Sequence, residues 1–193
     1  MKLTKKQIVR YRDRKVVLVD EENCVVGEGD LIEAHREGGK KHRAFSLVLY
    51  RKIESRVEVL LQRRAAVKPI FSGLWANTCC YNLAPGEEIV GRAKSRVKEE
   101  LGIDLEGSSL SELYRFSYEA EGEGGWWENE VDHIIVGEIY GEIVITPNPD
   151  EVMDYKWIEW EKMKEWMMRK PGVFAPWWKM MVADGRVERH LSE

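Results

Sequence analysis

Strand-like and helix-like segments follow one another along this chain of 193 residues without a regular alternation, and that order restricts its fold. β-rich runs predict one hairpin from residues 15–19 and 24–26 and a second from residues 44–50 and 57–62. Residues 27–41, between the hairpins, are typical of a loop or a short helix. Because doubly wound parallel sheets need strands that alternate with helices, the pattern favours an α/β (α+β) fold in which a mixed sheet is sandwiched between helices.

One helix is predicted in the middle of the chain from a four-residue apolar period. The period runs through Ile89, Ala93, Val97 and Leu101. Gly102 follows at a position where helices commonly stop. On this helix Arg96 and Glu100 share the border of the buried stripe, while Glu99 falls on the far side. Glu100 is therefore the better candidate ligand, and Arg96 either forms an ion pair with it or contacts a phosphate group.

The C-terminal part is predicted to return to strands and to end in helices. Strands are expected at residues 113–120, 130–139, 142–145 and 152–158, and helices at residues 161–169 and 176–190. The length suits one sizeable core and is short for two, so we expect a single domain over residues 1–193.

Charge and hydropathy argue against two classes of partner. The 34 acidic and 30 basic residues are intermixed, for a net charge of -4, and no long basic block could follow a nucleic-acid backbone. No apolar run approaches the ~20 residues that span a bilayer, and the start has no apolar signal segment. Three cysteines, two of them adjacent, do not suit a disulfide framework. We expect a cytoplasmic protein, monomeric or homodimeric, that binds neither nucleic acid nor membrane.

Glu128 and Glu130 are two positions apart, so on a strand both carboxylates leave the same face of the sheet. Two carboxylates that close need a cation or a shared proton, which suits a metal ligand or an acid/base group. A solvated strand end is the alternative interpretation.

His35 and His42 precede the second hairpin. They match no compact zinc motif, and they become candidate metal ligands only beside other ligands.

Three further groups complete the candidate chemistry. Cys80 ends the run 75–80 and offers a thiol nucleophile or proton donor. Arg64 and Lys68 are either solvated charges or the counter-ions of a phosphorylated substrate. The chain has eight tryptophans, most of them expected in the core or in a cleft wall, and an indole face can stabilise a cation in a dry pocket. Together these residues predict a metal-assisted enzyme acting on a phosphorylated substrate.

In this order the residues resemble type I isopentenyl-diphosphate isomerases, a branch of the Nudix fold family, from about Val16 to Met181. The matching segments are His35 and His42 with 44–46, Gln62–Arg64 with Lys68, 75–80, Glu100–Gly102, Tyr118, 128–130, 150–155 and 174–177. The resemblance implies a Nudix-like mixed sheet between helices. It also implies a reaction of isoprenoid biosynthesis, the interconversion of isopentenyl and dimethylallyl diphosphate through a tertiary carbocation.

The resemblance assigns roles residue by residue. His35, His42, Glu128 and Glu130 would hold one divalent metal, and Glu100 would hold a magnesium ion bridged to the substrate diphosphate. Cys80, Glu130 and Tyr118 would be catalytic, with Cys80 on the opposite face of the substrate. The groups expected to bind the substrate are Arg64, Lys68 and Arg96 at the diphosphate and Trp177 at the carbocation.

The chain departs from the family pattern at three positions. Asn82 stands where the family has a third metal histidine, so the cofactor is expected to be Mg²⁺, with Mn²⁺ or Zn²⁺ left open at the histidine site. Tyr81 replaces a small residue, and Leu31 stands where a basic diphosphate contact is usual. Two other functions stay open: a Nudix pyrophosphohydrolase, against which Ser95-Arg96 argues because it replaces an Arg-Glu pair of the hydrolase motif, and a catalytically silent binding protein.

Overall fold

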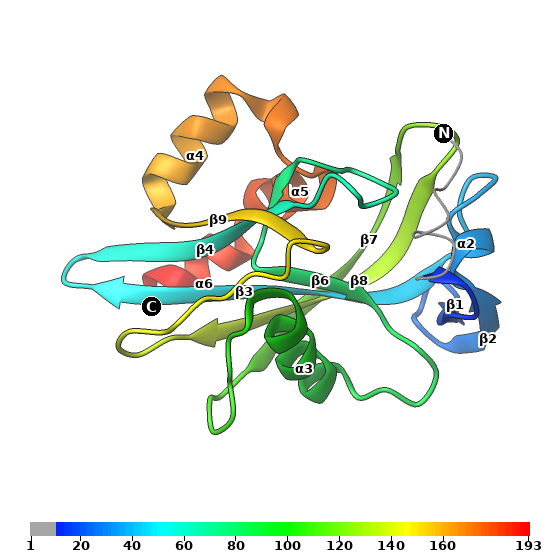
Figure 1. Ribbon diagram of the computed structural model, residues 1–193, viewed down its shortest axis with the longest axis horizontal. Helices are drawn as coiled ribbons and strands as arrows, with labels where there is room; N and C mark the ends of the chain where they lie inside the picture. Colours follow the sequence, from blue (N-terminus) through cyan, green and yellow to red (C-terminus); the bar gives the residue numbers. More distant parts are fainter. Residues whose placement is uncertain (1–10) are drawn as a thin grey trace.

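The computed structural model describes residues 11–193, which form a nine-stranded mixed sheet with helices on both faces (Figure 1). The strands are β1 (Lys15–Val19), β2 (Val25–Asp30), β3 (His42–Ile53), β4 (Arg56–Arg64), β5 (Trp75–Ala76), β6 (Cys79–Asn82), β7 (Ser111–Glu121), β8 (Trp127–Glu138) and β9 (Val152–Glu159). The helices are α2 (Leu31–Ala34), α3 (Ile89–Leu101), α4 (Trp160–Arg169), the 3₁₀ helix η1 (Pro171–Val173), α5 (Pro176–Asp184) and α6 (Arg186–Ser192).

Strand β3 is the centre of the sheet, because four other strands pair with it. It pairs with β1, β4 and β6 in the antiparallel sense and with β8 in the parallel sense. In the parallel register His42 lies opposite Glu130. In the antiparallel register with β6, Ser46 lies opposite Cys80 and Ala44 opposite Asn82. The registers of β3 therefore bring together groups that are far apart in the sequence.

Each face of the sheet has its own apolar core. Helix α3 covers one face, where Ala93, Val97 and Leu101 pack against buried residues of β3, β4 and β8. Helices α4, α5 and α6 cover the other face, through Met163, Trp178 and Leu191 among others. Figure 1 shows α3 on one side of the strands and α4 and α5 on the other. The prediction of a mixed sheet sandwiched between helices is confirmed.

Helix α3 begins and ends at the residues that local chemistry favours. Its N-cap, Glu88, accepts hydrogen bonds from the backbone N–H groups of Val90 and Gly91 at 3.0 and 2.7 Å. Gly102 ends the helix with φ +69°, and a Cβ there would meet Oγ1 of Thr146 at 1.9 Å. The predicted helix and its stop are confirmed. Arg96 and Glu100 are buried and Glu99 is exposed, as the helical period predicts.

One predicted element is wrong, and two others differ in detail. Residues 142–145 form no strand; instead Ile143 and Ile145 pack onto the core under α3 from an irregular segment, which produces the same apolar alternation. The helical structure predicted over 176–190 is confirmed, but Gly185, with φ +77°, divides it into α5 and α6. Residues 27–41, predicted as a loop or a short helix, contain the short helix α2 and also most of β2.

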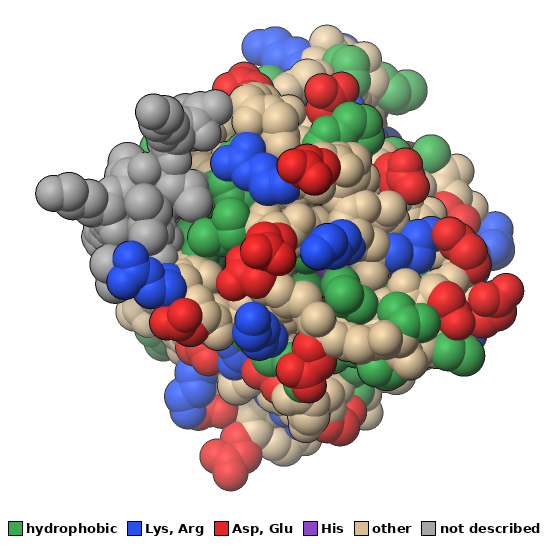
Figure 2. All heavy atoms as spheres, turned by 90° about the vertical axis from the view of Figure 1, so that its right-hand side faces the viewer, with side chains coloured by type: hydrophobic (Ala, Val, Ile, Leu, Met, Phe, Trp, Pro, Cys, Tyr) green, Lys and Arg blue, Asp and Glu red, His purple; other side chains and the backbone are tan. Residues whose placement is uncertain are grey.

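The end of the molecule that carries β1, β2 and α2 has acidic and basic side chains interspersed over its surface (Figure 2). Among the helices described within residues 11–193, none is long and apolar enough to cross a membrane.

Candidate active site

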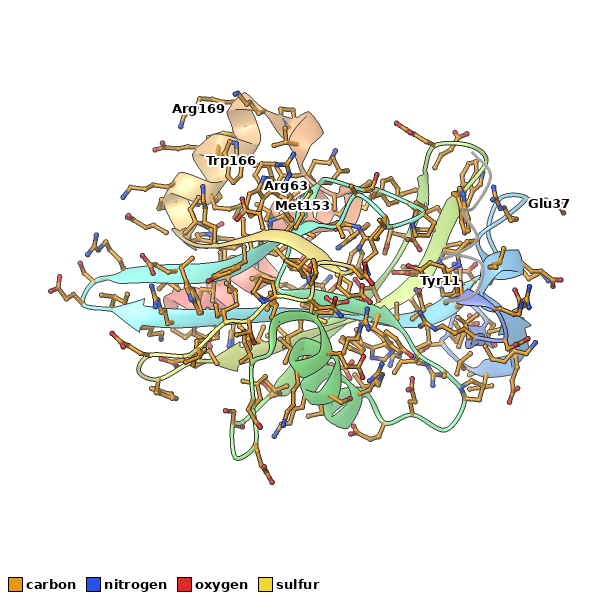
Figure 3. All side chains as sticks on the ribbon, viewed as in Figure 1. Tyr11, Glu37, Arg63, Met153, Trp166 and Arg169 are labelled. Atoms are coloured by element: carbon orange, nitrogen blue, oxygen red, sulfur yellow. The ribbon has the colours of Figure 1, made fainter. Side chains whose placement is uncertain are left out.

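A cavity of about 650 Å³, including its open mouth, lies where β3, β6 and β8 meet the N-terminal hairpin. Figure 3 shows Tyr11, one of its lining residues, beside β8 and this hairpin. The predicted site residues that line the cavity are His35, Arg64, Lys68, Cys80, Arg96, Tyr118, Glu128, Glu130 and Trp177. His42 and Glu100 lie directly behind this wall, in contact with Glu130 and Arg96 respectively. The fold thus gathers all the predicted residues at one place.

Strand β8 presents Glu128 and Glu130 on the same face, and both carboxylates are buried. His35 follows α2 and His42 begins β3, so the two histidines reach this face from different elements. Nε2 of His35 lies 3.0 Å from Oε2 of Glu128, and Nε2 of His42 lies 3.5 Å from Oε1 of Glu130. One ligand atom from each of the four residues lies within 4.8 Å of the other three.

Both imidazoles are oriented by backbone carbonyls. Nδ1 of His35 lies 2.7 Å from the carbonyl oxygen of Leu31, and Nδ1 of His42 lies 2.7 Å from that of Lys40. A carbonyl oxygen only accepts, so each Nδ1 must carry the hydrogen and donate it. In the neutral ring the lone pair is then on Nε2, the atom that faces the carboxylates. This is the tautomer in which a histidine binds a metal.

The four side chains fit a divalent cation. Burial lowers the pKa of His35, which keeps its ring neutral, so a lone pair on Nε2 lies 3.0 Å from a carboxylate oxygen of Glu128. That oxygen is buried and has no hydrogen-bond donor among the described residues. Burial, together with repulsion from Glu130, raises the pKa of Glu128 well above its usual range. Such electron-rich atoms can lie this close only when a proton or a cation is shared between them. A divalent cation can bind one ligand atom from each of the four side chains.

Asn82 extends this cluster from β6. Its Nδ2 donates to Oε1 of Glu130 at 2.6 Å and lies 3.1 Å from Nε2 of His42. The amide therefore occupies the position from which a side chain would complete the ligand set. It presents N–H groups there, and a half-turn of the amide would present Oδ1 instead.

Tyr118 and Glu130 form a hydrogen-bonded pair at the cavity wall. The Tyr118 hydroxyl donates to Oε2 of Glu130 at 2.7 Å, across the β7–β8 register in which the two residues are opposite. Burial alone would raise the pKa of Glu130, but its contact with His42 outweighs this and lowers the pKa to about 2. Burial and the charge of Glu130 raise the pKa of the Tyr118 phenol well above its usual range. The pair thus keeps one hydrogen between a phenol and a carboxylate.

Cys80 lines the cavity from β6, and its thiol contacts two polar groups. Sγ donates to Oδ1 of Asn77 at 3.1 Å and lies 3.5 Å from Oγ of Ser46. Ser46 in turn donates to Oδ2 of Asp132 at 2.7 Å. Burial, and after it the charge of Asp132, raises the pKa of Cys80 to about 12. Its neighbour Cys79 is fully buried in the core under α3 and faces away from the cavity.

Aromatic rings form the wall near the thiol. Trp177, at the start of α5, is buried against Tyr118 and Phe71, with ring centroids 6.4 and 5.6 Å away. The guanidinium of Arg64 lies 5.1 Å from the Trp177 ring and donates to the backbone carbonyls of Phe71 and Ile70, both at 3.1 Å. The indole face and the guanidinium are therefore neighbours in the same wall.

A second cluster of charges lies where α3 meets the cavity. Nη2 of Arg96 lies 2.5 Å from Oε1 of Glu100 and 2.7 Å from Oε1 of Glu151. Lys68 contacts the same two carboxylates, and Gln62 donates to Oε2 of Glu100 at 3.0 Å. Burial opposes ionisation of Glu100, but Arg96 and Lys68 outweigh it and lower its pKa. Glu100 is therefore an ionised carboxylate, separate from the histidine cluster.

Several residues of the site were not predicted from the sequence. They are Arg14, Ser46, Asn77, Asp132 and Glu151. Asp132 continues the two-residue period of Glu128 and Glu130 on β8, so that period could have identified it. Ser46, Asn77 and Glu151 lie in segments that carry the resemblance but were given no role, and Arg14 has no local pattern that distinguishes it.

Comparisons with known proteins agree with this geometry. The chain matches the NUDIX domain family over residues 40–178. It is 40% identical to an isopentenyl-diphosphate Delta-isomerase of Nocardia farcinica, over 84% of this chain and 89% of that protein. It is 35% identical to the isopentenyl-diphosphate Delta-isomerase of Photobacterium profundum, over 88% of this chain and 93% of that protein.

Solved structures are similar in fold. The protein DR0079 of Deinococcus radiodurans superimposes with a TM-score of 0.61 at 16% identity, covering 83% of this chain and 91% of its own. RenU, a Nudix hydrolase of M. smegmatis, superimposes with a TM-score of 0.53 at 16% identity, covering 92% of each chain.

Proposed function

Because the chain belongs to the isopentenyl-diphosphate Delta-isomerases within the Nudix family, we propose that it interconverts isopentenyl diphosphate and dimethylallyl diphosphate. The observation that carries the proposal is the pairing of Cys80 with the Tyr118–Glu130 pair in the wall of one cavity. Isomerisation needs one proton added to the terminal methylene carbon and one removed from the carbon two positions away. The Cys80 thiol and the Tyr118–Glu130 pair are two groups in one cavity that can carry these two protons.

One divalent metal would be held by His35, His42, Glu128 and Glu130, and Mg²⁺ together with the substrate diphosphate by Glu100. When bound, the cations would make the Glu130 carboxyl group more acidic and neutralise charge on the diphosphate. Asn82 can add an amide oxygen to the first set. We propose that this set favours Mg²⁺ or Mn²⁺ over Zn²⁺, because oxygen ligands suit the harder cations.

The Tyr118–Glu130 pair would move one of the two protons. Its hydrogen bond of 2.7 Å lies at the cavity wall, so the one proton that the two groups share can pass from either oxygen to the alkene, which leaves the pair with one more negative charge. Protonation of the terminal carbon breaks the π bond and leaves the positive charge on the neighbouring tertiary carbon. In the reverse reaction the same pair takes the proton back.

Cys80 would handle the second proton. Loss of a proton from the methylene group beside the cation forms the new double bond, and the C–H electron pair becomes its π bond. Cys80 would accept this proton as a thiolate and become a thiol; its sulfur lines the cavity and is held by Asn77 and Ser46. Its raised pKa keeps the resting group a thiol, which suits the direction in which Cys80 gives its proton.

The aromatic wall would protect the carbocation. The Trp177 indole is a π face beside the cavity, and such a face stabilises a desolvated cation by roughly 2 kcal/mol or more. Tyr118 and Trp126 also line the cavity, so three aromatic rings would shield the cation from water on that part of the wall. Exclusion of water favours isomerisation over hydration.

The diphosphate would be bound by the cationic end of the cavity. Arg64, Lys68 and Arg96 line it, and no predicted nucleophile other than Cys80 lies among them. Arg96 also argues against the pyrophosphohydrolase alternative. Its guanidinium contacts Glu100 at 2.5 Å from the helix position where hydrolysis would need a carboxylate.

The proposal is tested by incubating the purified protein with isopentenyl diphosphate and Mg²⁺ in D₂O. Isomerisation yields dimethylallyl diphosphate that carries deuterium, because both proton transfers exchange with solvent through the side chains. A hydrolase would instead release phosphate or pyrophosphate, and a binding protein would leave the substrate unchanged. Release of phosphate without deuterated product would refute the proposal.

We further propose that residues 1–193 act as one domain, monomeric or homodimeric, in the cytoplasm. Three free thiols, including exposed Cys24, suit a reducing compartment. Size-exclusion chromatography with light scattering tests the oligomeric state, and cell fractionation tests the location.

A further inference from the structure

Arg14 brings an unexpected positive charge to the cavity. It lies just before β1 and lines the same wall as Arg64, Lys68 and Arg96. Arg96 is near enough that its charge opposes that of Arg14. Positive charges that lie close together repel one another. A cluster of three arginines and a lysine in one cavity therefore indicates an anionic ligand.

The four cations differ in their counter-ions. Lys68 and Arg96 are paired with Glu100 and Glu151. Within residues 11–193, no carboxylate forms an ion pair with Arg14. The Arg14 guanidinium is therefore available to a ligand without first breaking a salt bridge.

Aromatic rings hold the Arg14 guanidinium in place. Its Cζ lies 4.8 Å from the centroid of the Tyr81 ring and 5.9 Å from that of Tyr11. Arg92 and Arg96 lie 4.2 and 5.3 Å from the same Tyr81 ring. Tyr81 thus contacts Arg14 as well as two arginines of α3, and it stabilises the Arg14 guanidinium by a cation–π contact.

The backbone places Arg14 beside the position of a missing charge. Leu31 donates its backbone N–H to the Arg14 carbonyl at 2.9 Å, and Leu31 also lines the cavity. Leu31 has no charge, although a basic residue is expected there from the resemblance. Arg14 therefore contacts two of the residues at which the chain departs from the family pattern. Its backbone pairs with Leu31, and its guanidinium lies against the bulky Tyr81 ring.

We propose that Arg14 binds the diphosphate of the substrate and that Tyr81 positions it. The proposal rests on the proposed function for the identity of the substrate, but the anion it needs is only a diphosphate group. A guanidinium can donate two N–H groups to phosphate oxygens at once, which gives the contact direction as well as charge.

The test compares Arg14→Gln with Arg12→Gln, a matched change at an exposed arginine two positions earlier. We expect Arg14→Gln to raise KM for isopentenyl diphosphate by about 10- to 100-fold, with a smaller effect on kcat, because the diphosphate does not react. Arg12→Gln should change neither. Arg14→Lys should recover part of the loss, because it keeps the charge but not the flat group over Tyr81.

Direct binding of inorganic pyrophosphate, measured by calorimetry with Mg²⁺, separates this proposal from the proposed function. If the unmodified protein fails to isomerise but Arg14→Gln still weakens pyrophosphate binding at least tenfold, only the proposed function is overturned. If the protein isomerises and Arg14→Gln binds both pyrophosphate and substrate as tightly as Arg12→Gln does, this proposal is overturned.

A double-mutant cycle tests the role of Tyr81 and covers the case in which Arg14→Gln does not fold. Tyr81→Leu should weaken pyrophosphate binding in the unmodified chain and have much less effect in the Arg14→Lys background, since the lysine no longer stacks on the ring. Equal effects of Tyr81→Leu in both backgrounds would show that Tyr81 does not act through Arg14.

Discussion

The indole Nε1 of Trp177 donates a hydrogen bond of 2.9 Å to Oδ1 of Asn77, a residue 100 positions earlier. The same oxygen accepts from Sγ of Cys80 at 3.1 Å. Nδ2 of Asn77 donates to the backbone carbonyls of Leu47 and Cys79, both at 3.0 Å, which determines the orientation of the amide. The buried Asn77 amide therefore fixes the position of the Cys80 thiol relative to the Trp177 indole.

Asn77→Ala is expected to lower the free energy of unfolding by roughly 2 to 4 kcal/mol, because buried N–H and C=O groups lose their partners. Turnover should fall as well, since both Trp177 and Cys80 lose their anchor. Denaturant unfolding and steady-state kinetics measure the two effects. Asn148→Ala, at an exposed turn amide, is the control. A variant with normal kcat would show that the amide does not position the thiol.

Cys80→Ala is expected to abolish isomerisation and leave the fold intact, because the thiol projects into the cavity and little packing depends on it. Cys79→Ala is the matched control at the adjacent, fully buried thiol. It should retain activity and lose roughly 1 kcal/mol of stability. Activity and thermal unfolding are measured on both variants. The opposite result, with Cys79 essential and Cys80 dispensable, would mean that the assignment is displaced by one residue.

The thiol of Cys80 should react slowly with iodoacetamide in metal-free protein. A pKa raised to about 12 keeps the thiol protonated, so at pH 9 only about 0.1% is the reactive thiolate. The labelling rate should rise about tenfold per pH unit up to about pH 12, whereas the rate for an ordinary thiol levels off above its pKa of about 8.5. Mass spectrometry of peptides follows Cys80, with exposed Cys24 as the internal comparison. Equal labelling of the two cysteines at pH 8 would contradict the raised pKa.

Glu128→Gln and Glu130→Gln are both expected to weaken metal binding, because each removes a charged oxygen from the cluster with His35 and His42. Glu130→Gln should lower turnover further, since Glu130 also accepts the Tyr118 hydroxyl proton. Metal content and kcat are measured on the same preparations. If metal loss and rate loss are equal in the two variants, Glu130 is a ligand without a role in proton transfer.

Asn82→His is expected to raise zinc affinity, because an imidazole replaces an amide that now contacts Glu130 and His42 through its N–H group. The unmodified protein should contain little zinc when purified and should depend on added Mg²⁺ or Mn²⁺. Elemental analysis before and after dialysis against a chelator tests both statements. Stoichiometric zinc that survives the chelator in the unmodified protein would show that Asn82 does not weaken the site.

Some features of the site were determined by the sequence through local rules. Helix α3, its stop at Gly102 and the burial of Arg96 with Glu100 follow from a 3.6-residue period and a left-handed C-terminal residue. The common face of Glu128 and Glu130 follows from the two-residue period of a strand. Local rules fail where a different packing produces the same pattern. Ile143 and Ile145 alternate like a strand because an irregular segment packs them onto the core.

Other features were decided only by the tertiary structure. The parallel register of β3 and β8 sets His42 opposite Glu130. The anchoring of Trp177 by Asn77 and the entry of Arg14 beside Tyr81 likewise join distant parts of the chain. Local patterns reflect the geometry of a few neighbouring residues, whereas strand register is set by the burial of whole faces and by the closure of long loops. No short segment carries that information, so these relations appear only when the complete chain has packed.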